Sequence, residues 1–148
     1  YGLKMSNVIN FKAHHENAMI PSRAGDDEVG FDLTIIEKVK DISSNTSMYD
    51  SHISVQPPSG FYFEIVPRSS ISKLGYILTN SIGIIDPSYR GTLKVVLTKI
   101  NDNVPDLELP NKRFQLIPRP FISNNFKINV TTSLNDTSRG DGGFGSTD

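Results

Sequence analysis

Short runs of β-branched and aromatic residues, each followed by turn-forming residues, recur along this chain of 148 residues. Apolar and polar residues alternate within the runs, as they do in strands, and clusters of Gly, Pro, Asn, Asp and Ser separate the runs about every 8 to 12 residues. The runs lie at residues 8–13, 31–36, 53–55, 61–66, 83–85, 92–97, 113–117 and 126–130. This spacing predicts an all-β sandwich or barrel.

Helices and long connections have little room between these runs. One helical turn is expected at residues 70–74, where Gly75 closes it. Residues 38–54 are rich in Asp, Ser, Asn and Thr, which predicts a long mobile connection with only a short strand at its end, near residues 53–55. The strand at residues 113–117 is expected to be limited by the prolines around it, Pro110, Pro118 and Pro120.

The length and the apolar content suit a single domain. A chain of 148 residues with 36% apolar residues can bury about two thirds of the surface that its unfolded form exposes. Residues 1–137 are expected to form this domain, and the Gly-rich residues 138–148 a flexible C-terminal arm. Residues 1–4 precede Met5 and are expected to be a cloning remnant.

Charge and residue content exclude several classes of protein. A net charge of -1 argues against stable binding of nucleic acid, which needs a basic stripe. The absence of cysteine excludes disulfides and thiolate metal sites, and no apolar run reaches the roughly 18 residues of a membrane-spanning helix. These features favour a soluble, intracellular protein, cytoplasmic or nuclear, that meets any anionic ligand with local Arg and Lys side chains.

The most informative stretch is an apolar run that ends in a carboxylate. Residues 83–85 lead into Asp86, a Pro-Ser turn follows, and Tyr89 precedes the alternating residues 92–97. The pattern predicts a β-hairpin that presents one acid and one aromatic ring at its tip. By itself, the stretch is also compatible with an ordinary Asp-Pro-Ser turn that carries a surface tyrosine.

Four further stretches of the chain help to interpret residues 83–91. They are residues 29–33, 67–75, 114–117 and 139–148. Together with residues 83–91 they resemble, in order, spacing and chemistry, the five motifs of the trimeric dUTPases, enzymes that split dUTP into dUMP and pyrophosphate. The resemblance covers about residues 20–148. It implies an all-β barrel or jelly roll like that of the dUTPases, with one short helix, assembled as a homotrimer whose subunits share active sites.

The resemblance assigns the chemistry of the third motif. The matching aspartate of the dUTPases orients the attacking water, so Asp86 is implied to act as the general base in an in-line attack on the α-phosphorus. Tyr89 matches the tyrosine that packs under the deoxyribose and excludes a 2'-hydroxyl. Uracil is implied to be bound by the hairpin backbone around Gly83 and Ile85. The amide of Asn80 is implied to help, although a purely structural Asn80 stays an alternative.

The resemblance also implies how the triphosphate is held. Arg68 and Ser69, with Ser70 beside them, match the phosphate-binding second motif, and a guanidinium suits phosphate oxygens. The C-terminal arm is implied to come from a neighbouring subunit and to close over the nucleotide as a lid. Its matching residues are Phe144, which stacks on uracil beside Gly145, and Arg139, Ser146 and Thr147, which reach the γ-phosphate.

The fourth and first motifs depart from the usual pattern. Gln115 matches the amide that helps to hold the phosphates. Either Lys112 replaces the usual arginine of that motif or the chain is one residue shorter there, so Arg113 receives no role. Asp32 matches the first-motif aspartate but follows Val-Gly rather than Ala-Gly. It is implied to contact Mg²⁺ through water while the ion binds mainly to the phosphates, and a purely structural Asp32 stays open.

Three alternatives stand beside a dUTPase. The dCTP deaminases share this fold but differ at the positions that read the base and move protons. A nucleotide-gated binding protein would keep the fold and use closure of the arm to control a partner. An unrelated β-sandwich, such as a capsid domain, is the third. The Asp-Pro-Ser-Tyr stretch and the Gly-Phe-Gly arm favour the dUTPase.

Overall fold

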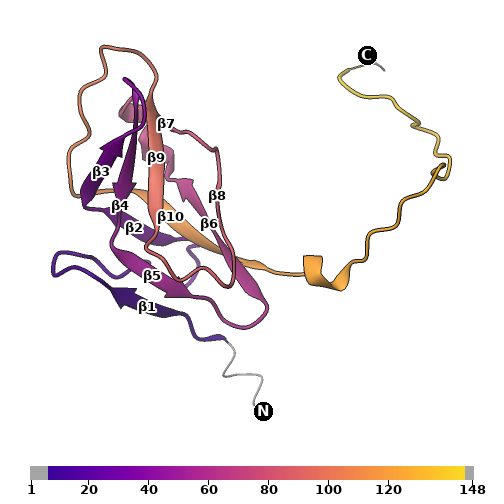
Figure 1. The fold of residues 1–148 in the computed structure, drawn as a ribbon, viewed down its shortest axis with the longest axis horizontal. Helices are drawn as coiled ribbons and strands as arrows, with labels where there is room; N and C mark the ends of the chain where they lie inside the picture. Colours follow the sequence, from indigo (N-terminus) through magenta and orange to yellow (C-terminus); the bar gives the residue numbers. More distant parts are fainter. Residues whose placement is uncertain (1–6, 146–148) are drawn as a thin grey trace.

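The structure, a computed structural model, describes residues 7–145. These residues contain ten strands and two short 3₁₀ helices, joined by loops (Figure 1). The strands are β1 (Asn10–Ala13), β2 (Phe31–Ile35), β3 (Glu37–Asp41), β4 (Thr46–Asp50), β5 (Ile53–Gln56), β6 (Phe61–Pro67), β7 (Tyr76–Leu78), β8 (Gly83–Ile85), β9 (Lys94–Lys99) and β10 (Asn111–Pro120), and the helices are η2 (Ser69–Lys73) and η3 (Ser123–Asn125). The predicted all-β class is confirmed. No helix among residues 7–145 is long and apolar enough to cross a membrane.

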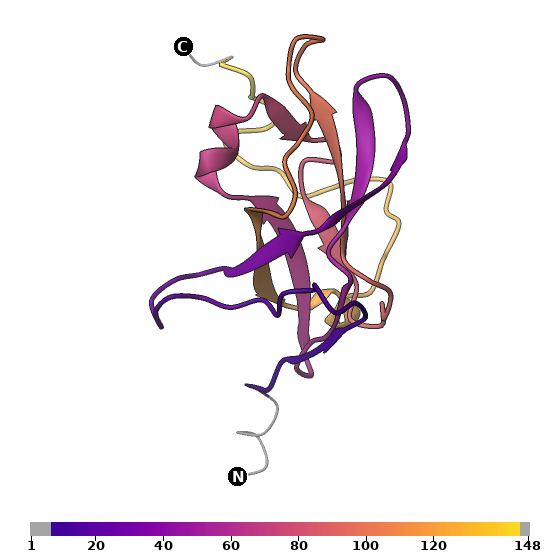
Figure 2. The same ribbon diagram turned by 90° about the vertical axis from the view of Figure 1, so that its left-hand side faces the viewer.

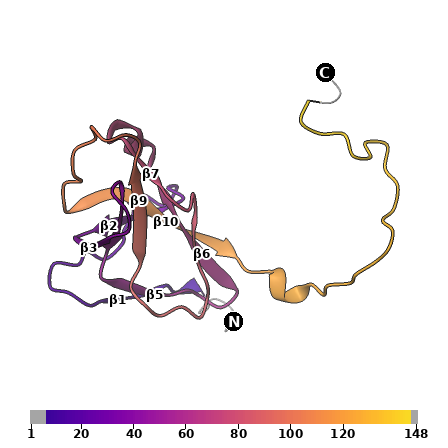
Figure 3. The ribbon, with the colours of Figure 1, turned by 45° about the horizontal axis from the view of Figure 1, so that its top comes forward.

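The strands pair antiparallel in three sheets. Two four-stranded sheets, in the orders β2-β10-β6-β8 and β3-β4-β9-β7, form the body, and β1 pairs with β5. Seen from the side, β3, β4 and β9 lie on one side of the body and η2 on the other (Figure 2). The chain after β10 leaves the body as an extended segment, and the described part of the C-terminal arm, residues 138–145, lies at its end (Figure 3).

Apolar side chains from the two large sheets and from β5 form the core. The buried apolar residues are Leu33, Ile35, Tyr49, Ile53, Val55, Phe63, Ile65, Tyr76, Leu78, Leu93, Val95, Leu97, Phe114 and Leu116. Phe114 and Leu116 of β10 are both fully buried. Because successive side chains of a strand point to opposite faces, Gln115 between them faces outward, and so does Asp32, its partner on β2. The alternation thus places two expected site residues on the outer face of one sheet.

The helical turn expected at residues 70–74 is present as η2, a 3₁₀ helix. The backbone N–H of Leu74 donates to the carbonyl of Ile71 at 3.0 Å, and Gly75 follows with a φ of 77°. Glycine adopts this left-handed conformation without the steric cost that other residues carry. A Cβ at this position would also stand 2.8 Å from Cγ2 of Val104. The prediction that Gly75 closes this turn is confirmed.

The prediction of a mobile connection at residues 38–54 is wrong. Strands β3 and β4 form a hairpin there, with Glu37 opposite Asp50. All residues of β3 are exposed, as befits an edge strand with solvent on both faces. The register also shifts between Lys38 and Lys40. A polar edge strand with a bulge lacks the alternation by which strands are recognised in a sequence.

The predicted hairpin of residues 83–97 is wrong in its pairing. Strand β8 pairs with β6, with Gly83 opposite Ile65, whereas β9 pairs with β4 and β7. Residues 86–92, called the Tyr89 turn below, therefore cross from one sheet to the other. Local spacing predicts two strands and a turn, but the long-range partners of each strand decide which sheet it joins.

The strand at residues 113–117 was expected to be limited by Pro110, Pro118 and Pro120. Strand β10 does begin just after Pro110 and end at Pro120, but the prediction is wrong for Pro118. The strand continues to Pro120, with Pro118 opposite Phe63 of β6. Strand β2 pairs with β10 only as far as Leu116. The prolines thus lie where β10 has a single neighbour, and a proline, which has no N–H, is tolerated there.

No strand forms at residues 126–130, where alternation predicted one. The alternating apolar side chains Phe126, Ile128 and Val130 are 70%, 96% and 92% exposed. A strand needs the backbone of a second strand for its hydrogen bonds. In the single chain, residues 126–130 lie in the extended segment that follows β10, away from both large sheets (Figures 1 and 3).

Candidate active site

Residues of the first and fourth motifs lie side by side on the outer face of the β2-β10-β6-β8 sheet. Gln115 is opposite Asp32 on one side and Val66 on the other, so their side chains share one face. Gln115 Nε2 donates to the Pro67 carbonyl at 3.4 Å. Its side chain lies over Gly30, where a Cβ would collide with Gln115 Oε1 and stand 3.0 Å from Gln115 Cβ. Gly30 therefore makes room for the amide.

Arg68 joins these residues from the end of β6. Its backbone N–H donates to the Arg113 carbonyl at 2.8 Å, and its Nη1 donates to the Lys112 carbonyl at 3.4 Å. Its Nε lies 3.6 Å from Oδ1 of Asp32, and the two side chains are 42% and 39% exposed. The guanidinium is thus oriented by the protein but remains open to an anion. The group will be called the Arg68 cluster and consists of Asp32, Arg68, Ser69, Ser70 and Gln115.

The Tyr89 turn holds its aromatic ring in a defined place. The backbone N–H of Tyr89 donates to the Asp86 carbonyl at 3.1 Å, and the phenol donates to the Thr92 carbonyl at 2.8 Å. Arg90 Nη1 donates to the carbonyl of Pro87 at 2.7 Å. The ring lies across Gly91, where a Cβ would collide with the Tyr89 hydroxyl and stand 2.6 Å from Cζ of the ring.

Asp86 and Tyr89 border the same small cavity. The cavity has a volume of about 190 Å³ and is lined by Ile84, Ile85, Asp86, Tyr89, Thr92 and Lys94. Asp86 is exposed and Tyr89 is 40% exposed, so both can reach a ligand. The arrangement places a carboxylate that can accept a proton beside an aromatic ring that can pack against a sugar.

A second hollow lies next to Asp86. It has a volume of about 280 Å³, and Tyr62, Ile84, Asp86 and Phe121 are among its lining residues. Burial, followed by the hydrogen bond that the phenol donates to Glu64, raises the pKa of Tyr62 above its ordinary value. The phenol is therefore neutral at physiological pH, and Asp86 does not face a second negative charge from it.

Asn80 and Gly83 lie at the entry to β8. Residues 79–82 lead from β7 to β8, and Ser81 there has a φ of 66°. A Cβ built on Gly83 would lie 3.9 Å from Nδ2 of Asn80 and 3.3 Å from Cβ of Ile65. The Asn80 amide is therefore beside the Gly83 backbone. Strand β8 is an edge strand of its sheet, so one side of its backbone faces away from β6.

The structure does not bring Asp86 and the Arg68 cluster together within one chain. Ile85 lies opposite Phe63, so the next residue, Asp86, comes beside Tyr62 at the far end of β6 from Arg68. Arg68 is six residues further along the chain, which at about 3.3 Å per strand residue is a separation of about 20 Å. One chain therefore carries two separate parts of the predicted site.

The C-terminal arm is apart from both. Phe144 has a φ of 53° and a fully exposed side chain, and Gly145 has a φ of 77°. Arg139 Nε donates to the Gly142 carbonyl at 2.7 Å, within the arm itself. Ser146 and Thr147, two further expected phosphate contacts, lie outside the described residues.

Acidic and histidine side chains do not form a metal cage in the described chain. No group of three or more His, Cys, Asp or Glu residues among residues 7–145 is arranged to hold a metal ion. Asp32 nevertheless offers a partly exposed carboxylate beside Arg68. This donor fits an ion that takes most of its ligands from phosphates and water.

Sequence reasoning missed Gly30, Thr92 and Lys94 as parts of these groups. Gly30 follows a valine and precedes the first-motif strand, and a glycine in that place signals a close approach of another group. Thr92 and Lys94 line the cavity with Asp86 and Tyr89. The alternation of residues 92–97 makes them ordinary outward-facing residues, so no sequence signal distinguishes them.

Replacing Gly91 with alanine is expected to reduce kcat/KM of the reaction at the Asp86 cavity about ten- to hundred-fold, because the new Cβ displaces the Tyr89 ring. The free energy of unfolding should change by less than about 1 kcal/mol, since the ring can swing into solvent. Steady-state kinetics and thermal unfolding measure the two effects. Gly25→Ala is the matched control, because its Cβ meets only the ends of two exposed side chains, Asp27 Oδ1 at 3.2 Å and Glu28 Oε2 at 3.9 Å. Equal activity of both variants would contradict the placement of the ring.

Known proteins with similar sequences and structures identify the family. The dUTPase family model matches residues 16–148. Two curated relatives named deoxyuridine 5'-triphosphate nucleotidohydrolase come from Escherichia phage T5 and from Clostridioides difficile. The first is 35% identical over 147 residues, covering 94% of this chain and 97% of the relative. The second is 33% identical over 148 residues, covering 99% and 98%.

Solved structures agree on the fold. A mutant of the dUTPase of Staphylococcus bacteriophage 80alpha, solved with dUpNHpp, superposes with a TM-score of 0.79 at 19% identity. The match covers 95% of this chain and 98% of the phage chain. The predicted dUTPase-like all-β fold is thereby confirmed. From the family model and the curated relatives together, the chain belongs to the dUTPase family.

Proposed function

We propose that this chain hydrolyses dUTP to dUMP and pyrophosphate, and that Asp86 positions the water that attacks the α-phosphorus in line. The observation that carries the proposal is the cavity that Asp86 shares with Tyr89. An exposed carboxylate at its edge can accept a proton from a bound water. The family membership of the chain supports the same reaction.

Tyr89 provides the selection against ribose. An apolar pocket rejects an added hydroxyl only weakly, so a ring that physically fills the space under the sugar is the better device. Its phenol is held by the Thr92 carbonyl at 2.8 Å, which fixes the ring. Uracil is read by the outward backbone edge of β8 at Gly83 and Ile85, with the Asn80 amide beside it.

The separation within one chain supports a homotrimer with shared sites. About 20 Å along β6 is more than a triphosphate spans, so Asp86 and Arg68 of the same chain do not hold one nucleotide. Each site takes Asp86 and Tyr89 from one subunit and the Arg68 cluster from another. In that cluster Arg68, Ser69, Ser70 and Gln115 donate to phosphate oxygens.

The arm completes the site of another subunit. Residues 138–148 close over the bound nucleotide, with Phe144 on uracil beside Gly145, and with Arg139, Ser146 and Thr147 toward the γ-phosphate. The full exposure of Phe144 supports this role, because a ring of that size is rarely left in solvent without a function. The exposed alternating residues 126–130 similarly suit a strand edge offered by a neighbouring subunit.

Mg²⁺ is bound chiefly by the three phosphates and by water. Asp32, through one of those waters, is the residue of this chain that contacts its hydration shell. Its partly exposed carboxylate beside Arg68 supports that assignment. When bound, the ion supplies positive charge that offsets the charge developing on the pyrophosphate leaving group.

Pyrophosphate release from dUTP, dTTP, dCTP and UTP in parallel tests the proposal. We expect turnover of dUTP with Mg²⁺, little turnover of the other three nucleotides, and loss of turnover after chelation with EDTA. Ammonia release from dCTP would instead identify a deaminase. If dUTP binds without being cleaved, the fold serves a nucleotide-gated binding protein. Absence of any binding would overturn the proposed site itself.

A further inference from the structure

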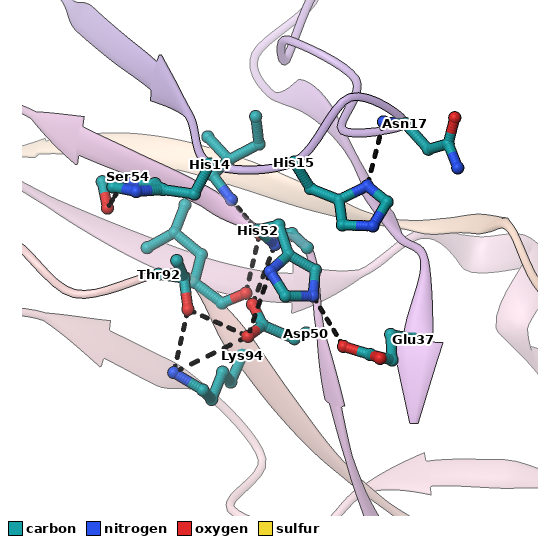
Figure 4. A network of polar contacts seen from close by, with 12 residues as sticks. His14, His15, Asn17, Glu37, Asp50, His52, Ser54, Thr92 and Lys94 are labelled. Carbon is teal, nitrogen blue, oxygen red and sulfur yellow. Dashed lines mark hydrogen bonds and ion pairs between the residues drawn. The ribbon is translucent and has the colours of Figure 1, made fainter. Parts of the chain in front are cut away.

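A buried carboxylate lies directly behind the Tyr89 turn. Asp50, the last residue of β4, is 6% exposed and is not among the residues that line the cavity of Asp86. Its Oδ1 accepts the backbone N–H of His52 at 2.8 Å, and its Oδ2 accepts the hydroxyl of Thr92 at 3.1 Å. Nζ of Lys94 lies 3.9 Å from the same Oδ2 (Figure 4).

Thr92 connects this carboxylate to the tyrosine. Its hydroxyl donates to Asp50, and its backbone carbonyl accepts the phenol of Tyr89 at 2.8 Å. Lys94 Nζ donates to the same Thr92 hydroxyl at 2.9 Å. Hydrogen bonds to an ionised and desolvated carboxylate are stronger than neutral ones. The position of the Thr92 carbonyl, and with it the phenol, therefore depends on Asp50.

Strand β5 supports the turn at a second point. Ser54 Oγ donates to the Arg90 carbonyl at 2.9 Å, and Nε2 of His14 lies 2.8 Å from the same Oγ. Leu93 N–H donates to the Ile53 carbonyl at 2.7 Å. The turn is thus attached on both sides of Gly91, at Arg90 and at Thr92.

The connection between β4 and β5, residues 51–52, has a strained backbone at His52. Its φ of 57° is left-handed, a conformation that is costly for a residue other than glycine and that persists only where the surroundings fix it. Its N–H donates to Asp50 Oδ1 at 2.8 Å, its Nε2 lies 2.7 Å from Oε1 of Glu37, and its carbonyl accepts the N–H of His14 at 2.9 Å. Asp50 thus acts on both the strained connection and the Tyr89 turn.

We propose that Asp50 is a positioning residue for Tyr89 and thereby sets the discrimination between deoxyribose and ribose nucleotides. The inference rests on the proposed function of Tyr89 as the residue that excludes the 2'-hydroxyl. Asp50 does not line the cavity and reaches it through Thr92 and Lys94, which both do. Thr92 is the link that holds the phenol, so the expected effect is on the place of the ring.

The test is the ratio of kcat/KM for dUTP to kcat/KM for UTP. Asp50→Asn should lower this ratio about ten-fold, because a small displacement of a positioned group has effects of this order. Thr92→Val, which keeps the shape but removes the hydroxyl, should lower it similarly. The double variant should lower it no further, since both changes break one connection. Additive losses, or an unchanged ratio in both single variants, would overturn the inference.

Two further variants separate this inference from the function on which it rests. Asp41→Asn is the matched control, because Asp41 also accepts from a hydroxyl, Ser47 Oγ at 2.6 Å, and from a lysine, Lys38 Nζ at 3.1 Å. It should leave the ratio unchanged. Tyr89→Ala should lower the ratio at least as much as Asp50→Asn. An unchanged ratio in Tyr89→Ala would refute the role of Tyr89, whereas a loss there without a loss in Asp50→Asn and Thr92→Val would refute only the role of Asp50.

Discussion

Asp86→Asn is expected to lower kcat for dUTP by about 100- to 10,000-fold, the usual contribution of a general base. An amide keeps the shape of the carboxylate but cannot take a proton from the attacking water. KM and nucleotide binding should change little, because the other contacts to the base, the sugar and the phosphates are untouched. Pyrophosphate release measures the rate, and calorimetric titration with dUpNHpp measures binding.

The matched control for this substitution is Asp106→Asn. Asp106 is an exposed carboxylate paired with Nζ of Lys99 at 2.8 Å, and it is not among the residues that line either hollow around Asp86. Its replacement should leave kcat unchanged. If Asp86→Asn retained more than about one tenth of the wild-type kcat, another group would have to activate the water.

Mixing two inactive variants is expected to restore activity. Asp86→Asn and Arg68→Ala each damage every site of their own homotrimers. In mixed trimers a site regains both residues when its Asp86 comes from the Arg68→Ala chain and its Arg68 from the Asp86→Asn chain. Random assembly in equal amounts should give about one quarter of intact sites. The measurement is pyrophosphate release after the two variants are unfolded and refolded together.

Two controls show whether recovered activity comes from mixed trimers. Each variant refolded alone should stay inactive, and mixing without refolding should restore little activity if the subunits exchange slowly. A single-chain site would give no recovery at any mixing ratio, because every chain then carries a defect. That result would contradict the separation of Asp86 from Arg68 as a functional feature. A mixture of Asp86→Asn with Tyr89→Ala serves as a further control, since both residues come from one turn and cannot complement each other.

Local patterns were sufficient for much of the fold. Strands β2 and β6 appear where alternating or aromatic runs predicted them, and Gly75 ends η2 as expected. Polar strands escaped recognition, because β3 is exposed throughout and has no apolar face. The pattern at residues 126–130 was strand-like, but a strand forms only where another backbone is available to it.

The sequence by itself determined the residue types and order that mark this chain as a dUTPase, because Asp86, Tyr89, Arg68 and Gln115 stand in recognisable motifs. It also determined where strands such as β2 and β6 form, since alternation is a local property. Only the tertiary structure decided that β8 and β9 join different sheets, and that Asp86 and Arg68 lie at opposite ends of β6. It alone placed Asp50 behind Thr92, 42 residues away in the chain. These relations depend on which distant strands pair, and pairing is set by the burial of the whole core rather than by any short stretch of sequence.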